Sequence, residues 1–177
     1  MGDLSRQRGF TLIEACIVIA VTALVTGAAV PGLQAVLEGR RLSGAATLLA
    51  TDIQYVRTEA LARNRPLRLS FHADGDSACY VIHTGTAAQC TCATEGAALC
   101  SEGAEQIKTV HLPASERVGL QANVASVLFD PLHGTSTPTG TLRVIGTQGR
   151  EVRHVINIMG RVRSCSPQGA MPGFKAC

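Results

Sequence analysis

One stretch near the start of the chain limits what the protein can become. Residues 10–30 form an apolar run with a single charged side chain, Glu14. As a helix, these 21 residues would extend over about 31 Å, roughly the thickness of one bilayer hydrocarbon core. Arg6 and Arg8 precede the run, so the extreme N-terminus is expected to face the cytoplasm. The sequence therefore predicts a membrane-spanning segment.

The order of residues around this run indicates how it is processed. An ordinary secretory signal has its cleavage site after the apolar stretch and loses that stretch. Here a basic leader and Gly9 come first, followed by the run FTLIE from Phe10 to Glu14. This order resembles the prepilin signal of type IV pilins and type II secretion pseudopilins. The resemblance implies that a prepilin peptidase cuts between Gly9 and Phe10, that Phe10 is N-methylated, and that the apolar helix stays as an inner-membrane anchor.

Glu14 is costly at its position and therefore a candidate for function. A carboxylate inside a membrane helix costs about 2.5–3.5 kcal/mol on insertion scales. The resemblance implies that Glu14 pairs with the terminal amine of a neighbouring subunit during assembly. The alternative is a glutamate near a helix end that reaches the membrane interface. Pro31 removes a hydrogen bond to the carbonyl of Gly27, so a kink is expected there.

The helical pattern continues beyond the membrane. Apolar residues recur at i, i+3, i+4 and i+7 spacing, at Leu42, Ala45, Ala46, Leu49, Ile53, Val56 and Ala60. The opposite face is expected to carry Arg41, Asp52, Arg57 and Glu59. Because the residue before a proline avoids the helical region, the segment Asn64-Arg65-Pro66 should end the helix.

After residue 64 the pattern changes to that of strands. Leu67, Leu69 and Phe71 alternate with polar residues, as in a half-buried strand. Further strands are predicted at 79–82, 107–112, 118–122, 126–130, 141–146 and 152–158. Residues 85–106 and 131–140 are rich in turn residues and are expected to be loops.

These elements predict an α+β fold similar to that of type IV pilins. A long N-terminal helix, first transmembrane and then amphipathic, should pack on a C-terminal antiparallel β-sheet domain. The expected divisions are a cleaved leader at 1–9, a transmembrane helix at 10–30, an amphipathic periplasmic helix at 31–63, and a β-rich periplasmic domain at 64–177 that ends in a basic, cysteine-bounded tail.

Three further segments resemble one pilin branch, the GspH/FimT family of minor subunits. They are VRTEALARNRPLRL at 56–69, FDPLHG at 129–134 and VINIMGRVR at 155–163. Together with the N-terminal signal they occur in order over most of the chain. The resemblance implies that other pilin or pseudopilin subunits are partners.

Seven cysteines are many for a reduced cytosolic protein. Cys16 lies alone in the apolar run, and the other six are candidates for disulfides in an oxidising compartment, namely Cys79, Cys90, Cys92, Cys100, Cys165 and Cys177. Six cysteines allow 15 pairings, and the sequence does not select one. A metal cluster around the Cys90-x-Cys92 segment, with His83 nearby, is a weaker alternative because the usual C-x₂₋₄-C spacing is missing.

Other site chemistry receives little support. The two carboxylates of Asp74-Gly75-Asp76 could belong to a calcium-binding loop, but the other oxygen ligands of such a loop are missing, so a plain turn is favoured. The nucleophile-elbow, zincin and dinucleotide-binding motifs are all missing from the sequence. The five histidines are scattered, and most are expected at the surface or at sheet edges. We therefore expect no enzyme, no cofactor and no metal.

The C-terminal segment is strongly basic. Residues 140–177 contain six Arg or Lys side chains against Glu151 alone. Gly160-Arg161-Val162-Arg163 matches the Gly-Arg-x-Arg motif of FimT-type competence pilins, and this resemblance implies a DNA-uptake site at Gly160, Arg161 and Arg163.

Physical reasoning supports the same interpretation of the tail. Residues at i and i+2 point to the same side of an extended segment, so the two guanidinium groups of the motif can reach successive phosphates. Arg153 and Lys175 are candidates for further contacts, and a Cys165–Cys177 bond would close the tail into a loop. The alternative is a solvated basic edge that discourages sheet pairing.

Two functions share the signal, the anchor and the fold. One is a minor type IV pilin that assists pilus assembly and binds double-stranded DNA without sequence preference. The other is a GspH-like pseudopilin of a type II secretion system, which has no nucleic-acid partner. The basic tail favours the pilin.

The signal predicts a single processing event. We expect the mature membrane form to begin at N-methylated Phe10, because the peptidase removes only the basic leader. Intact-mass and N-terminal peptide mass spectrometry of the membrane fraction measure this directly. A leader that remains attached, or a cut beyond residue 30, would contradict the prepilin interpretation.

Overall fold

The computed structural model describes residues 10–74, 77–93 and 97–177, without the side chains of Pro31 and Asp74. The chain divides into two compact units, Met1–Leu37 and Glu38–Cys177. Gly75 and Asp76 of the Asp74-Gly75-Asp76 turn lie outside the described residues, as do the leader and Gly9. The buried core lies entirely in the second unit.

One helix, α1 (Leu12–Arg63), runs from the first unit into the second. Its first part is long and apolar enough to cross a membrane, and no residue of its most apolar stretch is buried in the protein. The helical assignment continues through Pro31, and the kink expected there stays a prediction. Helix α1 ends as predicted: Asn64 has a φ of 49°, the amide of Arg65 donates to the carbonyl of Ala60 over 3.2 Å, and Pro66 follows.

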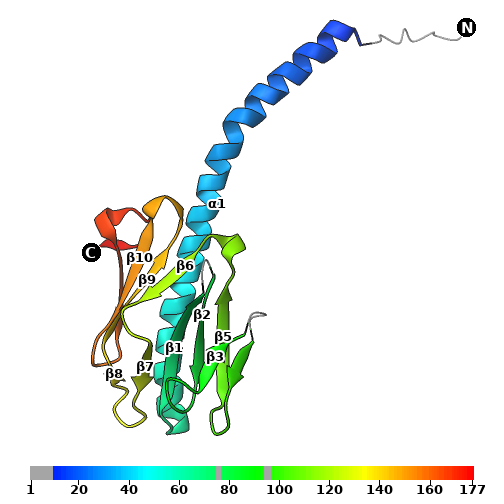
Figure 1. The fold of residues 1–177 in the computed structure, drawn as a ribbon. Coiled ribbons are helices and arrows are strands. Elements are labelled where there is room, and N and C mark those ends of the chain that lie inside the picture. The colour runs from blue at the N-terminus through cyan, green and yellow to red at the C-terminus, as the bar shows by residue number, and fades with distance from the viewer. Residues whose placement is uncertain (1–9, 75–76, 94–96) are drawn as a thin grey trace, which may run out of the picture. The chain divides into compact units, whose positions relative to one another are not determined.

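The predicted apolar stripe of the helix is the centre of the second unit. Leu42, Ala46, Leu49, Ile53, Val56 and Ala60 are all at most 1% exposed. They form one hydrophobic core with side chains from both large sheets. Figure 1 shows the sheets around this lower part of α1. The fold class predicted from the sequence is confirmed.

The first sheet contains five strands. They are β1 (Leu67–Asp74), β2 (Ser77–His83), β5 (Gln106–Leu112), β7 (Ser126–Phe129) and β8 (Ser136–Thr137), in the order β5-β2-β1-β7-β8 with every pair antiparallel. In β1, Leu67 and Leu69 are buried against the core, as the alternation predicts.

The second sheet also contains five strands. They are β6 (Gly119–Ala122), β9 (Gly140–Ile145), β10 (Glu151–Ile156), β11 (Val162–Ser166) and β12 (Lys175–Ala176), in the order β12-β11-β10-β9-β6. The pair β11–β12 is parallel and the others are antiparallel. Short 3₁₀ turns lie at Ala114–Glu116, Thr147–Gly149 and Pro167–Gly169.

Two segments predicted as loops contain strands. Residues 85–106 include the hairpin of β3 (Cys90–Cys92) and β4 (Ala98–Cys100), and residues 131–140 include β8. The sequence does not reveal the hairpin because its strands are three residues long and lie among turn residues. Disulfides hold it: Cys90 bonds to Cys100 within the hairpin, and Cys92 bonds to Cys79 on β2.

The helix face opposite the core differs from the prediction. Asp52 is 2% exposed and accepts hydrogen bonds from the Tyr80 hydroxyl over 2.7 Å and from the Lys108 ammonium over 2.6 Å. Burial and this carboxylate raise the pKa of Tyr80. Asp52 was therefore wrongly assigned to the solvent face: it lies three residues after Leu49 and four before Val56, so it borders the apolar stripe, and its charge is satisfied there by two partners.

Two histidines also differ from the prediction that most lie at the surface. His83 and His154 are fully buried. His83 contacts the hydroxyl of Ser70 and the carbonyl of Thr84, and burial lowers its pKa. Burial likewise lowers the pKa of His154 to about 4, against an opposing contribution from the backbone of Ala46. Both rings are thus parts of the interior, where burial disfavours their charged forms.

Candidate nucleic-acid interface

The outer face of the second sheet carries a row of basic residues. Strand register places Gln121 of β6 opposite Arg143 of β9, and Arg143 opposite Arg153 of β10. Arg153 lies opposite Cys165 of β11, which in turn lies beside Lys175 of β12. Residues directly opposite each other share one face of a sheet. The three basic side chains of this row therefore lie on the same surface.

Part of this charge is neutralised by Glu151. Arg143 donates two hydrogen bonds to one oxygen of the Glu151 carboxylate, and Arg153 donates to the other oxygen. Burial acts to raise the pKa of Glu151, but the hydrogen bonds and charges of the two arginines outweigh it, so the pKa lies below its usual value. Arg153, a predicted DNA contact, is thus held in an ion pair.

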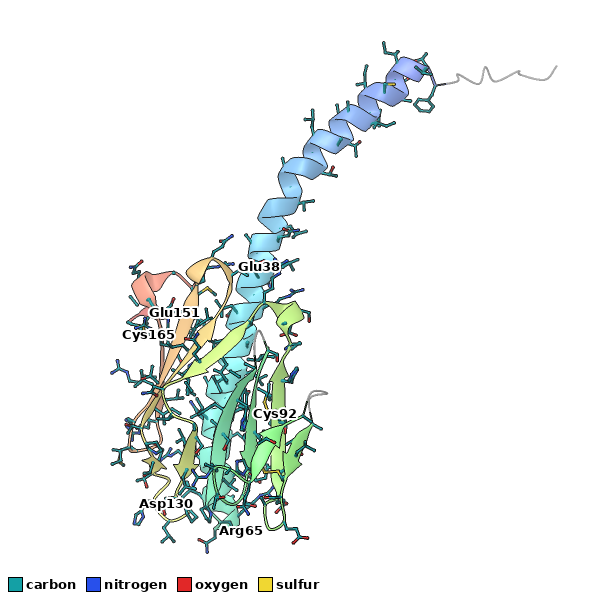
Figure 2. All side chains as sticks on the ribbon, viewed as in Figure 1. Glu38, Arg65, Cys92, Asp130, Glu151 and Cys165 are labelled. Atoms are coloured by element: carbon teal, nitrogen blue, oxygen red, sulfur yellow. A yellow bond between two sulfur atoms is a disulfide. The ribbon has the colours of Figure 1, made fainter. Side chains whose placement is uncertain are left out.

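Arg150 is also engaged elsewhere. Its Nη2 lies 3.6 Å from Oε2 of Glu38 on α1. Glu38 also receives hydrogen bonds from Thr147 and Arg117, which lower its pKa. Figure 2 shows Glu38 and Asp130 at opposite ends of the domain. The ion pair of Arg150 with Glu38 therefore links the β9–β10 connection to the helix.

The two motif arginines and Lys175 have a different environment. Arg161, Arg163 and Lys175 are exposed, and none of them forms an ion pair within the described ranges. Val162, between the two arginines, packs against the core. The exposed arginines therefore flank an inward-facing residue on the outer side of an extended segment. This is the arrangement that the i, i+2 spacing predicts.

The tail is fixed rather than loose. A disulfide joins Cys165 of β11 to Cys177, with 5.0 Å between their Cα atoms. Met171 is 2% exposed, and its amide donates to the hydroxyl of Ser166 over 3.2 Å. Lys175 is thereby held beside Cys165 in the parallel pair of β11 and β12. In Figure 2, Cys165 and Glu151 lie close together on this sheet.

The turn between β10 and β11 presents Arg161. Asn157 organises it: its side-chain oxygen accepts from the Arg161 amide over 3.0 Å, and its carbonyl accepts from the Gly160 amide over 2.9 Å. Gly160 has a φ of 68°, which favours glycine. The turn is bonded to strand β8, because the amide and hydroxyl of Ser136 donate to the carbonyls of Ile158 and Asn157, respectively.

Sequence reasoning missed a contact beneath this turn. Arg57, expected on the solvent face of the helix, is half-buried, and its Nε donates to the carbonyl of Gly134 over 2.9 Å. Arg57 lies four residues after Ile53 and three before Ala60, so helical spacing places it beside the apolar stripe, a signal that the sequence prediction did not use. The segments that carried the family resemblance do contain it together with Gly134 and Gly160.

The N-terminal candidates lie in the other unit. Phe10 is 86% exposed, and Glu14 is exposed in the first turn of α1, where its amide bonds to the hydroxyl of Thr11. The hydroxyls of Thr22 and Thr26 donate to carbonyls one turn earlier, as a polar group in an apolar environment requires. Cys16 is a free, exposed thiol.

The thiols of the six-cysteine set are used in covalent bonds. All six form the three disulfides given above. Among the described residues, no three His, Cys, Asp or Glu side chains gather in a way that could hold a metal ion.

Two family models match the chain. The model described as a prokaryotic N-terminal methylation motif matches residues 4–30, and the model described as type II transport protein GspH matches residues 45–160. The second match covers more than half of the chain. The chain belongs to the GspH family.

Other comparisons are weaker. Two crystal structures of the type IV minor pilin FimU from Pseudomonas aeruginosa strain PAO1 are similar to this chain. The P21 form is 18% identical, covers 73% of this chain and 94% of its own, and has a TM-score of 0.49. The P65 form is 19% identical, covers 71% and 97%, and has a TM-score of 0.48. No curated protein matches significantly.

Membership of the GspH family, with the methylation motif, makes this a prepilin-type protein of the GspH/FimT kind. The family consists of pilin and pseudopilin structural subunits. The apolar part of α1 coincides with the methylation motif, as expected of a membrane-anchored subunit.

The tail disulfide generates a measurable prediction. Changing both Cys165 and Cys177 to Ser should lower the free energy of unfolding by about 3 kcal/mol, the chain-entropy value for a loop of this length. Chemical denaturation of residues 38–177, which contain the entire core, measures the difference. Non-reducing peptide mapping should recover the Cys165–Cys177 peptide pair, and free thiols at both positions would rule the loop out.

Proposed function

We propose that this protein is a minor type IV pilin that helps to assemble a pilus and binds double-stranded DNA without sequence preference. The observation that carries the DNA part is the group of three exposed cations, Arg161, Arg163 and Lys175, around the disulfide-closed edge of the second sheet. In this proposal the mature chain crosses the bacterial inner membrane once, residues 38–177 lie in the periplasm, and the role is structural and binding rather than catalytic.

The assembly part is supported by the outer face of the helix. Every exposed position of α1 from 44 to 62 is uncharged: Gly44, Thr47, Leu48, Thr51, Gln54, Tyr55, Thr58, Leu61 and Ala62. The hydroxyls of Thr51 and Thr58 bond to carbonyls of their own helix. A face without charges, on which two of the hydroxyls are already bonded within the helix, can pack against helices of other subunits at a modest desolvation cost.

Glu14 provides the test of assembly. We expect Glu14→Ala to insert into the membrane and to be processed at Gly9–Phe10, because losing the carboxylate lowers the insertion cost. The variant should fail to co-purify with partner pilins, since it cannot pair with a neighbour's terminal amine. Thr11→Ala is the matched control in the same turn. Normal co-assembly of Glu14→Ala would show that the carboxylate is incidental.

The proposed DNA contact is made to phosphates. Two guanidinium groups on one side of an extended segment match the spacing of oxygens along a nucleic-acid backbone. The tail's one aromatic side chain, Phe174, packs against the core and is not available for stacking on bases. Gly160, Arg161 and Arg163 form the centre of the site, with Lys175 beside them. Arg153 is a weaker contributor because Glu151 holds its charge.

Salt dependence tests the DNA proposal. The full-length protein in detergent should bind a labelled duplex weakly, with affinity falling as salt rises by about 0.9 in log–log slope per phosphate contact. Changing Arg161 and Arg163 together to Gln should reduce that slope by about 1.8 if each holds one phosphate. Arg143→Gln is the matched control, since that arginine is engaged with Glu151. Equal affinities and slopes for wild type and the double variant would refute the proposed site.

A second function is favoured by one specific observation. The matching family model is described as a type II transport protein, which fits a pseudopilin of a secretion system. Such a subunit shares the anchor and the fold but needs no DNA. Wild-type protein that binds no duplex at low salt would therefore favour the pseudopilin over the pilin.

A further inference from the structure

The turn that presents Arg161 packs on a small surface, the seat, formed by the carbonyl of Gly134 and the side chain of Arg57. A Cβ atom at position 160 would overlap the carbonyl oxygen of Gly134 and would lie 2.9 Å from Cδ and 3.0 Å from Nε of Arg57. The glycine of the motif therefore meets two groups at once, one on the β7–β8 loop and one on the helix. Its lack of a side chain is required for this close approach as well as for its φ of 68°.

The β7–β8 loop is shaped to provide this seat. Oδ1 of Asp130 accepts hydrogen bonds from the amides of Leu132 and His133, at 3.0 and 2.8 Å. The amide of His133 and, more weakly, that of Leu132 lower the pKa of Asp130, although desolvation opposes the shift. Gly134 follows with a φ of 62° and donates to the Asp130 carbonyl. The loop thus turns the Gly134 carbonyl toward Arg57.

The Arg57 side chain connects this loop to the turn between β10 and β11. Its Nε–H donates to the Gly134 carbonyl, and the stem of the same side chain underlies Gly160. A lysine at position 57 would keep the charge. It would lose the N–H that projects from the side of the stem and the planar group against which Gly160 packs. The arrangement therefore depends on arginine specifically.

We propose that Arg57 is a positioning residue for the basic site: it holds Gly134 and Gly160 together so that Arg161 and Arg163 are presented in a fixed orientation. This inference rests on the proposed DNA-binding function. When the backbone that carries Arg161 and Arg163 is already fixed before DNA binds, less conformational entropy is lost as the complex forms. Arg57 acts through the turn and does not itself hold a phosphate.

Two variants test this proposal in the full-length protein in detergent. Arg57→Lys keeps the charge and removes the Nε–H donor, and Gly160→Ala fills the seat. Both should weaken duplex binding about tenfold, the equivalent of one lost hydrogen bond from a charged donor. The log–log salt slope should stay at the wild-type value, because no phosphate contact is removed.

Gly149→Ala is the matched control. Gly149 has a φ of 70°, nearly that of Gly160, but a Cβ there would have nothing within 4 Å. It carries the same backbone strain without the close contact, so it should bind DNA as the wild type does. Equal losses in Gly149→Ala and Gly160→Ala would assign the effect to general destabilisation and would overturn the proposal.

Hydrogen exchange gives a readout that does not depend on DNA. The amides of Ser136, Gly160 and Arg161 should exchange roughly tenfold faster in Arg57→Lys, because the bonds that protect them open more often. Unchanged exchange and unchanged affinity would overturn the proposal. So would Arg57→Gln lowering the salt slope by about 0.9 while Arg57→Lys restores full affinity, since Arg57 would then be a phosphate contact.

The two readouts also separate the proposals. Wild-type protein that binds no duplex refutes the proposed function, and the exchange rates in Arg57→Lys still decide whether Arg57 holds the turn.

Discussion

The structure of the second unit depends on one helix stripe that two sheets share. Leu42, Leu49 and Val56 lie in the same core as side chains of β1, β2, β9 and β10. Since neither sheet could bury its inner face without this stripe, the helix determines how the sheets are placed. The fit is close: a Cβ at Gly146 would lie 3.0 Å from a methyl group of Leu42.

Polar contacts also join the helix to the sheets, and they are spread over the part of α1 that lies in the second unit. Glu38 binds the connections before β6 and β10, Asp52 binds Tyr80 and Lys108 of the first sheet, and Arg57 binds Gly134. These contacts therefore also fix the rotation of the helix, which a stripe of small aliphatic side chains specifies less sharply.

Most of the secondary structure could be predicted because its causes are local. The helix stripe has a 3.6-residue period, Asn64-Arg65-Pro66 ends the helix, and β1 alternates. The hairpin of β3 and β4 could not be predicted, because disulfides and packing hold strands that are too short to show a period. Asp52 was misassigned and the burial of His154 was not predicted, because their partners are distant in sequence. For the candidate site, the charges of Arg161 and Arg163 are visible in the sequence, whereas the neutralisation of Arg153 and the contacts of Arg57 with Gly134 and Gly160 arise only in three dimensions.

The basic C-terminal segment shows how the fold sorts its charges. Of its six cations, Arg143 and Arg153 are bound by Glu151 and Arg150 by Glu38, so three serve the fold. Of the other three, Arg161 and Arg163 lie on a segment bounded by Gly160 at one end and the Cys165–Cys177 bond at the other, and Lys175 lies beside that segment on β12. The glycine is seated on Arg57 and Gly134, so residues from all three segments that resemble the GspH/FimT family meet at that end. A cationic edge that served only to prevent sheet pairing would not need its backbone fixed at both ends, because charge repulsion between sheet edges does not require an ordered backbone. Recognition of regularly spaced phosphates does gain from such order, since side chains on a fixed strand lose less freedom on binding.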